Sequence, residues 1–186
     1  SIRAVTPQHL LERSQRLRRQ WRNFTLLAKN YGQWTTIRDW VSVDEHGQPT
    51  PWYTYPTTEF LSHLDLSIFK VFEFGSGNST LWWSDRARQV TSVEDDRYWY
   101  DQIKSSLKNE NVDYRLETDK KKYFSMTDDG FDIFIVDGKY RRECLEHVVQ
   151  IARGRGVMLI LDHSDWYPTS LRVLTDHLGC VQTAFH

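Results

Sequence analysis

From residue 70 onward, short apolar runs alternate with segments of helical periodicity, and no other feature of the chain constrains its fold as strongly. Strand patterns are expected at residues 70–74, 89–94, 112–117, 131–138, 156–162 and 180–185, and helical patterns at 79–87, 96–109, 141–153 and 168–178. Parallel strands need a crossover connection, which is usually a helix, so strands that alternate with helices pair in parallel. The sequence therefore predicts an α/β fold with a doubly wound, mostly parallel sheet covered by helices on both faces.

The N-terminal part of the chain does not follow this alternation. Leucine and aromatic residues recur at helical spacing through residues 7–29, which predicts a basic amphipathic helix. Residues 31–56 are rich in Trp, Tyr, Gly and Pro and favour a short hairpin or an irregular layer, and helical spacing resumes at 57–66. We expect residues 1–56 to form an N-terminal extension, a basic helix with an aromatic cap, and residues 57–186 to form the sheet domain.

Size, charge and cysteine content exclude several classes of protein. The 186 residues suit one core of ordinary size, and a net charge of -1 argues against a general nucleic-acid binder. Residues 1–30 nevertheless carry seven Lys or Arg against one acid, a pattern typical of a helix with a solvated basic face. The apolar runs are too short to span a bilayer, so no membrane partner is expected. Cys144 and Cys180 form neither a disulfide framework nor a metal-ligand spacing, which favours a reducing, cytoplasmic location.

The strand at 70–74 ends in an acid followed by a glycine-rich turn, EFGSGNST. Gly75 permits a tight turn and Gly77 lets the backbone approach a ligand closely, which are the roles of such glycines between a strand and a helix. No lysine stands where a phosphate-binding loop requires it, and Thr80 occupies the third small position of a dinucleotide fingerprint. Glu73 would repel a pyrophosphate but would suit a ligand with a positive charge. An ordinary strand-to-helix turn is the simpler alternative.

These residues resemble motif I of the class I SAM-dependent methyltransferases, E/D-x-G-x-G, at Glu73, Gly75 and Gly77. The resemblance covers about residues 55–186 and implies a Rossmann-like fold that binds S-adenosyl-L-methionine (SAM). It places Glu94, at the end of the next strand, on both ribose hydroxyls, since a carboxylate accepts two hydrogen bonds in one plane. The remaining cofactor contacts would come from Ser79, Asp119 and Tyr55. A solvated helix start is the alternative role of Glu94.

Polar side chains follow the next two strands of the expected sheet: Asp137 after one, and Asp162 with His163 after the other. They resemble the metal-binding edge of O-methyltransferases of the catechol and caffeoyl-CoA type, which use an Asp after strand four and an Asp-Asn pair after strand five. The resemblance implies a divalent metal, Mg²⁺ or Mn²⁺, on Asp137, Asp162 and His163, and the histidine in place of the Asn disfavours Mg²⁺. Without a metal, these residues remain the expected catalytic group, with His163 or Asp137 as the base.

The class I resemblance also implies a seventh strand, antiparallel to the one expected at 180–185, and the sequence stops before it. A bare strand edge invites pairing, so either further residues or a second chain is expected to cover that edge. A homo-oligomer is therefore one expectation.

Taken together, these features predict a SAM-dependent methyltransferase that acts on an oxygen of a small molecule, either a natural product or a sugar-like compound. The chain lacks the Asn/Asp-Pro-Pro-aromatic motif of enzymes that methylate base amines, so no nucleic-acid partner is expected. Two alternatives stay open. One is an NAD-dependent oxidoreductase with a Rossmann fold, and the other is a non-catalytic interaction module that retains the SAM-binding fold.

Overall fold

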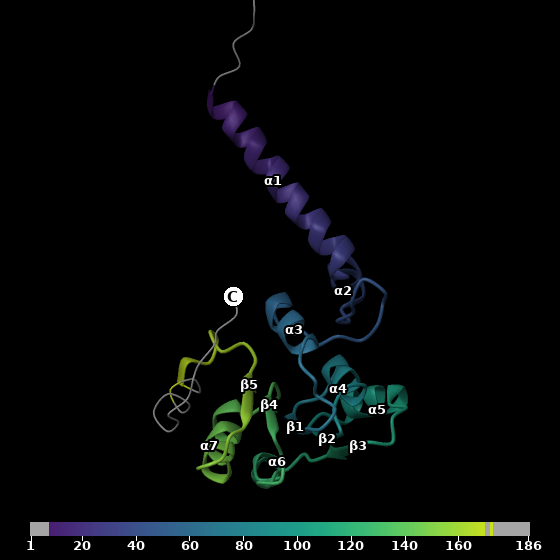
Figure 1. Ribbon diagram of the computed structural model, residues 1–186, viewed down its shortest axis with the longest axis vertical. Coiled ribbons are helices and arrows are strands. Elements are labelled where there is room, and N and C mark those ends of the chain that lie inside the picture. Colours follow the sequence, from purple (N-terminus) through teal and green to yellow (C-terminus); the bar gives the residue numbers. More distant parts are fainter. Residues whose placement is uncertain (1–7, 170–171, 173–186) are drawn as a thin grey trace, which may run out of the picture. The chain divides into compact units, whose positions relative to one another are not determined.

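The computed structural model describes residues 8–169 and residue 172 (Figure 1). The chain divides into two compact units, with the division between Pro49 and Thr50. Among the described residues, no helix combines the length and the apolar character that a membrane crossing needs.

The N-terminal unit contains the long helix α1 (Gln8–Asn30) and the short helix α2 (Gln33–Asp39). An antiparallel bridge between Val43 and Pro49 follows, closed by a turn in which Asp44 Oδ1 accepts hydrogen bonds from the backbone nitrogens of residues 46 and 48. The hairpin that the sequence predicts is present in this short form. The helix α2 was not predicted, because its seven residues are too few to display a helical period.

The second unit is an α/β domain, and its strands are connected through helices. Its elements in chain order are α3 (Tyr55–Ser62), β1 (Lys70–Phe74), α4 (Asn78–Ser84), β2 (Gln89–Glu94), α5 (Arg97–Ser106), β3 (Val112–Leu116), α6 (Lys120–Phe124), β4 (Ile133–Val136), α7 (Arg141–Ile151) and β5 (Met158–Leu161). The five strands are all parallel and lie in the order β3-β2-β1-β4-β5. The predicted fold class is confirmed. The strand expected at 180–185 and most of the helix expected at 168–178 lie outside the described residues.

Different helices cover the two faces of the sheet. Phe72 and Phe74 of β1 belong to a buried cluster with residues of α6 and α7, whereas Val71 belongs to a second cluster with Leu61 of α3 and Trp83 of α4. Because β1 is buried on both faces, its sequence is nearly continuously apolar instead of alternating. In Figure 1 the sheet accordingly lies between α4 on one side and α7 on the other.

The strand order fixes where a ligand can bind. The chain passes from β1 outward to β2 and β3, and then returns to place β4 on the opposite side of β1. The connections that leave the carboxyl ends of β1 and β4 therefore diverge, and in open α/β sheets this switch point is where ligands bind. The glycine-rich turn follows β1, and Asp137 follows β4.

Candidate functional site

The loops after β1 and β4 touch each other at the switch point through two glycines. Gly75 has a φ of +87°, and a Cβ on it would lie 2.6 Å from both the Cα and the backbone nitrogen of Gly138. A Cβ on Gly138 would in turn lie 2.8 Å from the backbone nitrogen of Gly75. Real side chains do not approach a backbone this closely, so both positions require glycine. Gly138 was missed in the sequence, although the Asp-Gly pair directly after a strand was a signal for it.

Gly77 has more freedom than Gly75. Its φ of 172° is extended backbone, and a Cβ there would meet only Ser79 Oγ at 3.9 Å and the Trp99 ring at 4.0 Å. Its backbone nitrogen donates to Thr80 Oγ1 at 3.1 Å, which closes the first turn of α4. An alanine at Gly77 would therefore fit the fold, and the position is a suitable probe of ligand binding.

Glu73 is fully buried beneath the glycine-rich loop. Its carboxylate accepts hydrogen bonds from Ser79 Oγ at 2.5 Å, from Thr80 Oγ1 at 2.5 Å and from Ser92 Oγ at 2.8 Å. Burial raises the pKa of Glu73 to about 7, although the three hydroxyls oppose this shift. The sequence predicts that Glu73 presents a charge to a ligand. In the structure it instead ties the start of α4 and the strand β2 to β1, and Ser79 serves this same network.

The raised pKa of Glu73 predicts a pH-dependent stability. The folded protein binds the Glu73 proton more tightly than the unfolded chain does, so this contribution is fully present below pH 4.5 and is lost as the pH rises to about 7. We expect the free energy of unfolding of the wild type, relative to Glu73→Gln, to fall by up to about 3 kcal/mol over this range. Urea unfolding at several pH values measures it. Glu110→Gln, at an exposed position, is the control and should show no such trend. If the difference in unfolding free energy between the wild type and Glu73→Gln does not change with pH, the raised pKa of Glu73 is wrong.

Glu94, at the end of β2, is buried and accepts four hydrogen bonds. The backbone nitrogen of Ser76 at 3.1 Å and its Oγ at 2.7 Å both donate to Oε2, while the backbone nitrogens of Asp95 and Asp96, each at 2.9 Å, donate to Oε1. The carboxylate therefore holds the glycine-rich loop against the loop that follows β2. A carboxylate offers about four acceptor sites, and all of them are used.

Ser76 is the residue that joins these elements, and sequence reasoning missed it. Its Oγ also lies 2.7 Å from the hydroxyl of Tyr114 on β3, and its carbonyl oxygen accepts from Trp99 Nε1 of α5 at 2.7 Å. Tyr114 in turn stacks on Tyr100, with ring centroids 4.4 Å apart. Trp99 thus lies across the loop next to Gly77. The helical pattern around Trp99 does not predict its contact with Ser76.

The other two expected cofactor residues have different positions. Asp119 is the N-cap of α6, where its Oδ1 accepts from the backbone nitrogen of Lys122 at 3.0 Å. Tyr55 is the first residue of α3 and is half-buried, and burial raises the pKa of its hydroxyl. Asp119 therefore has a structural role that accounts for its identity without a ligand.

A second polar cluster lies beyond β4 and β5, as the sequence predicted from the ends of these strands. Asp137, Asp162 and His163 each offer a ligand atom, and these atoms all lie within 4.8 Å of one another. His163 Nδ1 contacts Asp162 Oδ2. The backbone of His163 is left-handed, with a φ of 52°, and its ring lies 4.8 Å from that of Trp166, centroid to centroid.

Arg141 of α7 joins the ends of the two strands. Its Nη2 donates to Asp137 Oδ1 and to the Asp137 carbonyl oxygen, both at 2.8 Å. Its Nε donates to the Gly138 carbonyl oxygen at 3.1 Å, and its Nη1 donates to the Asp162 carbonyl oxygen. The guanidinium therefore already balances the charge of Asp137. A metal ion bound to all three candidate ligands would have to compete with this ion pair, so the residues fit a metal only if Arg141 moves.

Burial and the neighbouring Asp162 carboxylate raise the pKa of Asp137 to about 8, although Arg141 opposes the shift. The two carboxyl groups therefore hold a shared proton more tightly than separate carboxyl groups would. Perturbed groups of this kind are concentrated at functional sites.

Comparison with proteins of known structure identifies the fold. A methyltransferase-like protein from Silicibacter pomeroyi superposes with a TM-score of 0.56 and 22% sequence identity, over 74% of this chain and 84% of that chain. The chain has a methyltransferase-like fold. Coclaurine N-methyltransferase bound to N-methylheliamine and SAH matches more distantly, with a TM-score of 0.40 and 15% identity over 55% of this chain and 32% of that chain. No protein-family profile and no curated protein sequence matches the chain.

Proposed function

We propose that this chain is a SAM-dependent methyltransferase that methylates an oxygen of a small-molecule acceptor. The observation that carries the proposal is the junction of Glu94 with the glycine-rich loop. Ser76 bonds the carboxylate at the end of β2 to the loop that leaves β1, beside the switch point of the sheet. The methyltransferase-like fold supports the same conclusion.

On the cofactor side, the chain would hold the ligand with groups that already form one network. The hydroxyls of a ribose would replace the Ser76 Oγ bond on Glu94 Oε2, and the extended backbone at Gly77 would permit close approach once the Trp99 ring moves aside. We assign Glu73 the role of fixing the loop, since all its contacts are internal. SAM, when bound, supplies a methyl group activated by its sulfonium.

An NAD-dependent oxidoreductase is the alternative function, because its fold also has a glycine-rich loop after the first strand. Such a fold also places an acid on a ribose at the end of the second strand. Thr80 disfavours this alternative. The third glycine of a dinucleotide fingerprint allows the helix to pack closely on the strand. In this chain that position holds Thr80, which is fully buried and donates its hydroxyl to Glu73.

On the acceptor side, His163 is the proposed base. Its Nδ1 lies against Asp162 Oδ2, and with a proton on Nδ1 the ring would accept the proton of an acceptor hydroxyl at Nε2. Asp162 would orient the ring, while Arg141 joins the loop of Asp162 and His163 to the loop of Asp137. Alignment of the acceptor with the methyl group would supply much of the acceleration, since positioning contributes up to roughly 7–11 kcal/mol.

A divalent metal is the second candidate occupant of this edge. The three ligand atoms within 4.8 Å favour it, and the Arg141–Asp137 ion pair opposes it. Imidazole in the donor set suits Mn²⁺ better than Mg²⁺. If a metal binds, Asp137, Asp162 and His163 would hold it, and it would polarise the acceptor oxygen.

The proposal predicts binding of S-adenosylhomocysteine, the product form of the cofactor. It should raise the melting temperature of the wild type, and Glu94→Ala should weaken its binding by roughly 1.5–3 kcal/mol, because hydrogen bonds to a charged group are lost. Calorimetric titration measures the affinity, and Glu110→Ala, at an exposed acid, is the matched control. Unchanged affinity in Glu94→Ala would remove Glu94 from the site. Binding of NADH in place of S-adenosylhomocysteine would overturn the proposal.

A further inference from the structure

The helix α1 presents an exposed apolar strip. Leu17, Trp21 and Phe24 follow the spacing of four and three residues that places side chains on one face of a helix. The exposed fraction is 57% for Leu17 and 70% for Trp21, and Phe24 is also exposed. Trp21 and Phe24 contact each other, with ring centroids 5.9 Å apart. A large exposed aromatic strip of this kind indicates a surface that binds a partner.

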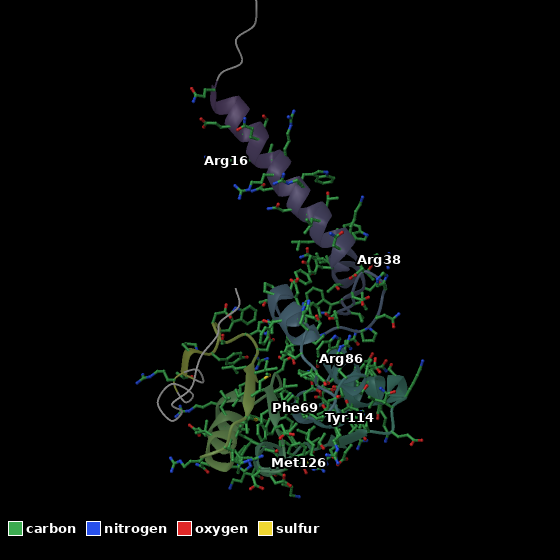
Figure 2. All side chains as sticks on the ribbon, in the orientation of Figure 1. Arg16, Arg38, Phe69, Arg86, Tyr114 and Met126 are labelled. Atoms are coloured by element: carbon green, nitrogen blue, oxygen red, sulfur yellow. The ribbon has the colours of Figure 1, made fainter. Side chains whose placement is uncertain are left out.

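The same helix is strongly cationic. Five arginines lie within ten residues, and all of them are exposed: Arg13, Arg16, Arg18, Arg19 and Arg22. Within residues 8–169, the structure gives none of the five an ion-pair partner. Glu12, the single acid of the helix, accepts a hydrogen bond from Gln8 instead. Figure 2 shows the side chains projecting along the length of α1, with Arg16 labelled among them.

The combination of these two features selects among the possible partners. A second copy of α1 would match the apolar strip but would bring two sets of unpaired arginines together. A nucleic acid would match the arginines but would leave the strip around Trp21 without a role. An anionic bilayer surface satisfies both, because the apolar face enters the boundary between headgroups and acyl chains while the arginines contact acidic headgroups.

We infer that α1 is an interfacial helix that binds the chain to anionic lipid bilayers. The helix lies in the plane of the surface and does not cross it, since it lacks the continuous apolar length that a crossing needs. The expectation of no membrane partner was drawn from the lack of a spanning segment, and it does not cover this mode of binding. The inference does not depend on the proposed catalytic function, and either can fail alone.

The test is sedimentation of the full chain with vesicles of phosphatidylcholine alone or of phosphatidylcholine with phosphatidylserine. Binding is expected only to the anionic vesicles and should weaken as salt increases. Replacing Arg16, Arg18 and Arg19 with Gln should weaken it on the order of 100-fold, at roughly fivefold for each arginine near the surface. Trp21→Ala should weaken it by about tenfold through loss of apolar burial.

Matched controls separate this surface from general charge or hydrophobicity. Lys120, Lys121 and Lys122 of α6 are also exposed, so their replacement with Gln removes the same charge elsewhere and should leave vesicle binding unchanged. Trp166→Ala removes an equally exposed tryptophan, at 72%, and should also have no effect. Equal binding to neutral vesicles, binding of RNA or DNA without binding of vesicles, or a dimer that Trp21→Ala dissociates would each overturn the inference.

Discussion

Gly75→Ala is expected to destabilise the sheet domain by on the order of 4 kcal/mol. The new Cβ would lie 2.6 Å from two backbone atoms of Gly138. Backbone hydrogen bonds hold both loop ends in place: the Gly75 nitrogen donates to the Val93 carbonyl oxygen, and the Asp137 nitrogen donates to the Phe74 carbonyl oxygen. The positive φ of Gly75 adds strain for any residue with a Cβ. Urea unfolding followed by circular dichroism measures the loss.

Gly77→Ala is the matched control, because it adds the same methyl group two residues later, where the nearest atom would lie at 3.9 Å. It should keep the stability of the wild type to within about 1 kcal/mol. It should nevertheless weaken binding of S-adenosylhomocysteine if, as proposed, the ligand approaches the backbone at Gly77, because the methyl group would then lie in its way. Wild-type stability in Gly75→Ala would show that the loops after β1 and β4 do not touch.

His163→Asn is expected to lower kcat by roughly 10²–10⁴-fold with an acceptor that the wild type methylates. Asparagine tolerates the left-handed backbone at this position, so the loop should keep its conformation. The affinity for S-adenosylhomocysteine should not change, since the Glu94 network does not include His163. A panel of hydroxyl-bearing acceptors, with methyl transfer followed by mass spectrometry, supplies the assay.

Asp162→Asn separates a base from a metal ligand when it is combined with a chelator. If His163 acts as the base, Asp162→Asn should also lose activity, because the ring loses the carboxylate that orients it, and EDTA should have no effect. If EDTA abolishes turnover and Mn²⁺ restores it, the three residues hold a metal and the assignment of His163 as the base is wrong. Full activity of His163→Asn would exclude His163 as the base, although a metal site would survive the change because an asparagine oxygen can also bind a metal.

Much of the fold could be predicted from the sequence because the elements are separated by clear changes of period. The runs at 70–74 and 89–94 became β1 and β2 with the expected bounds, whereas the strand expected at 131–138 is limited to Ile133–Val136. The helix α6 was not predicted, since five residues with three lysines show no apolar period.

Only the site residues that directly follow a strand could be placed from the sequence. Parallel strands end at the same edge of the sheet, so the positions of Asp137 and Asp162 alone indicated that they would meet. Ser76 and Arg141 act through tertiary contacts, which no local pattern displays. The orientation of Glu73 was equally hidden, because a strand buried on both faces does not show which face each side chain occupies.

The saturated carboxylate of Glu94 has a thermodynamic consequence for any ligand that binds there. Ser76 Oγ already occupies the position of an incoming hydroxyl, so association exchanges one bond for another of the same kind instead of adding one. The net gain at this carboxylate is therefore below the sum of the new bonds and at most about 1.5–3 kcal/mol, so selectivity for the correct ligand must come largely from contacts elsewhere.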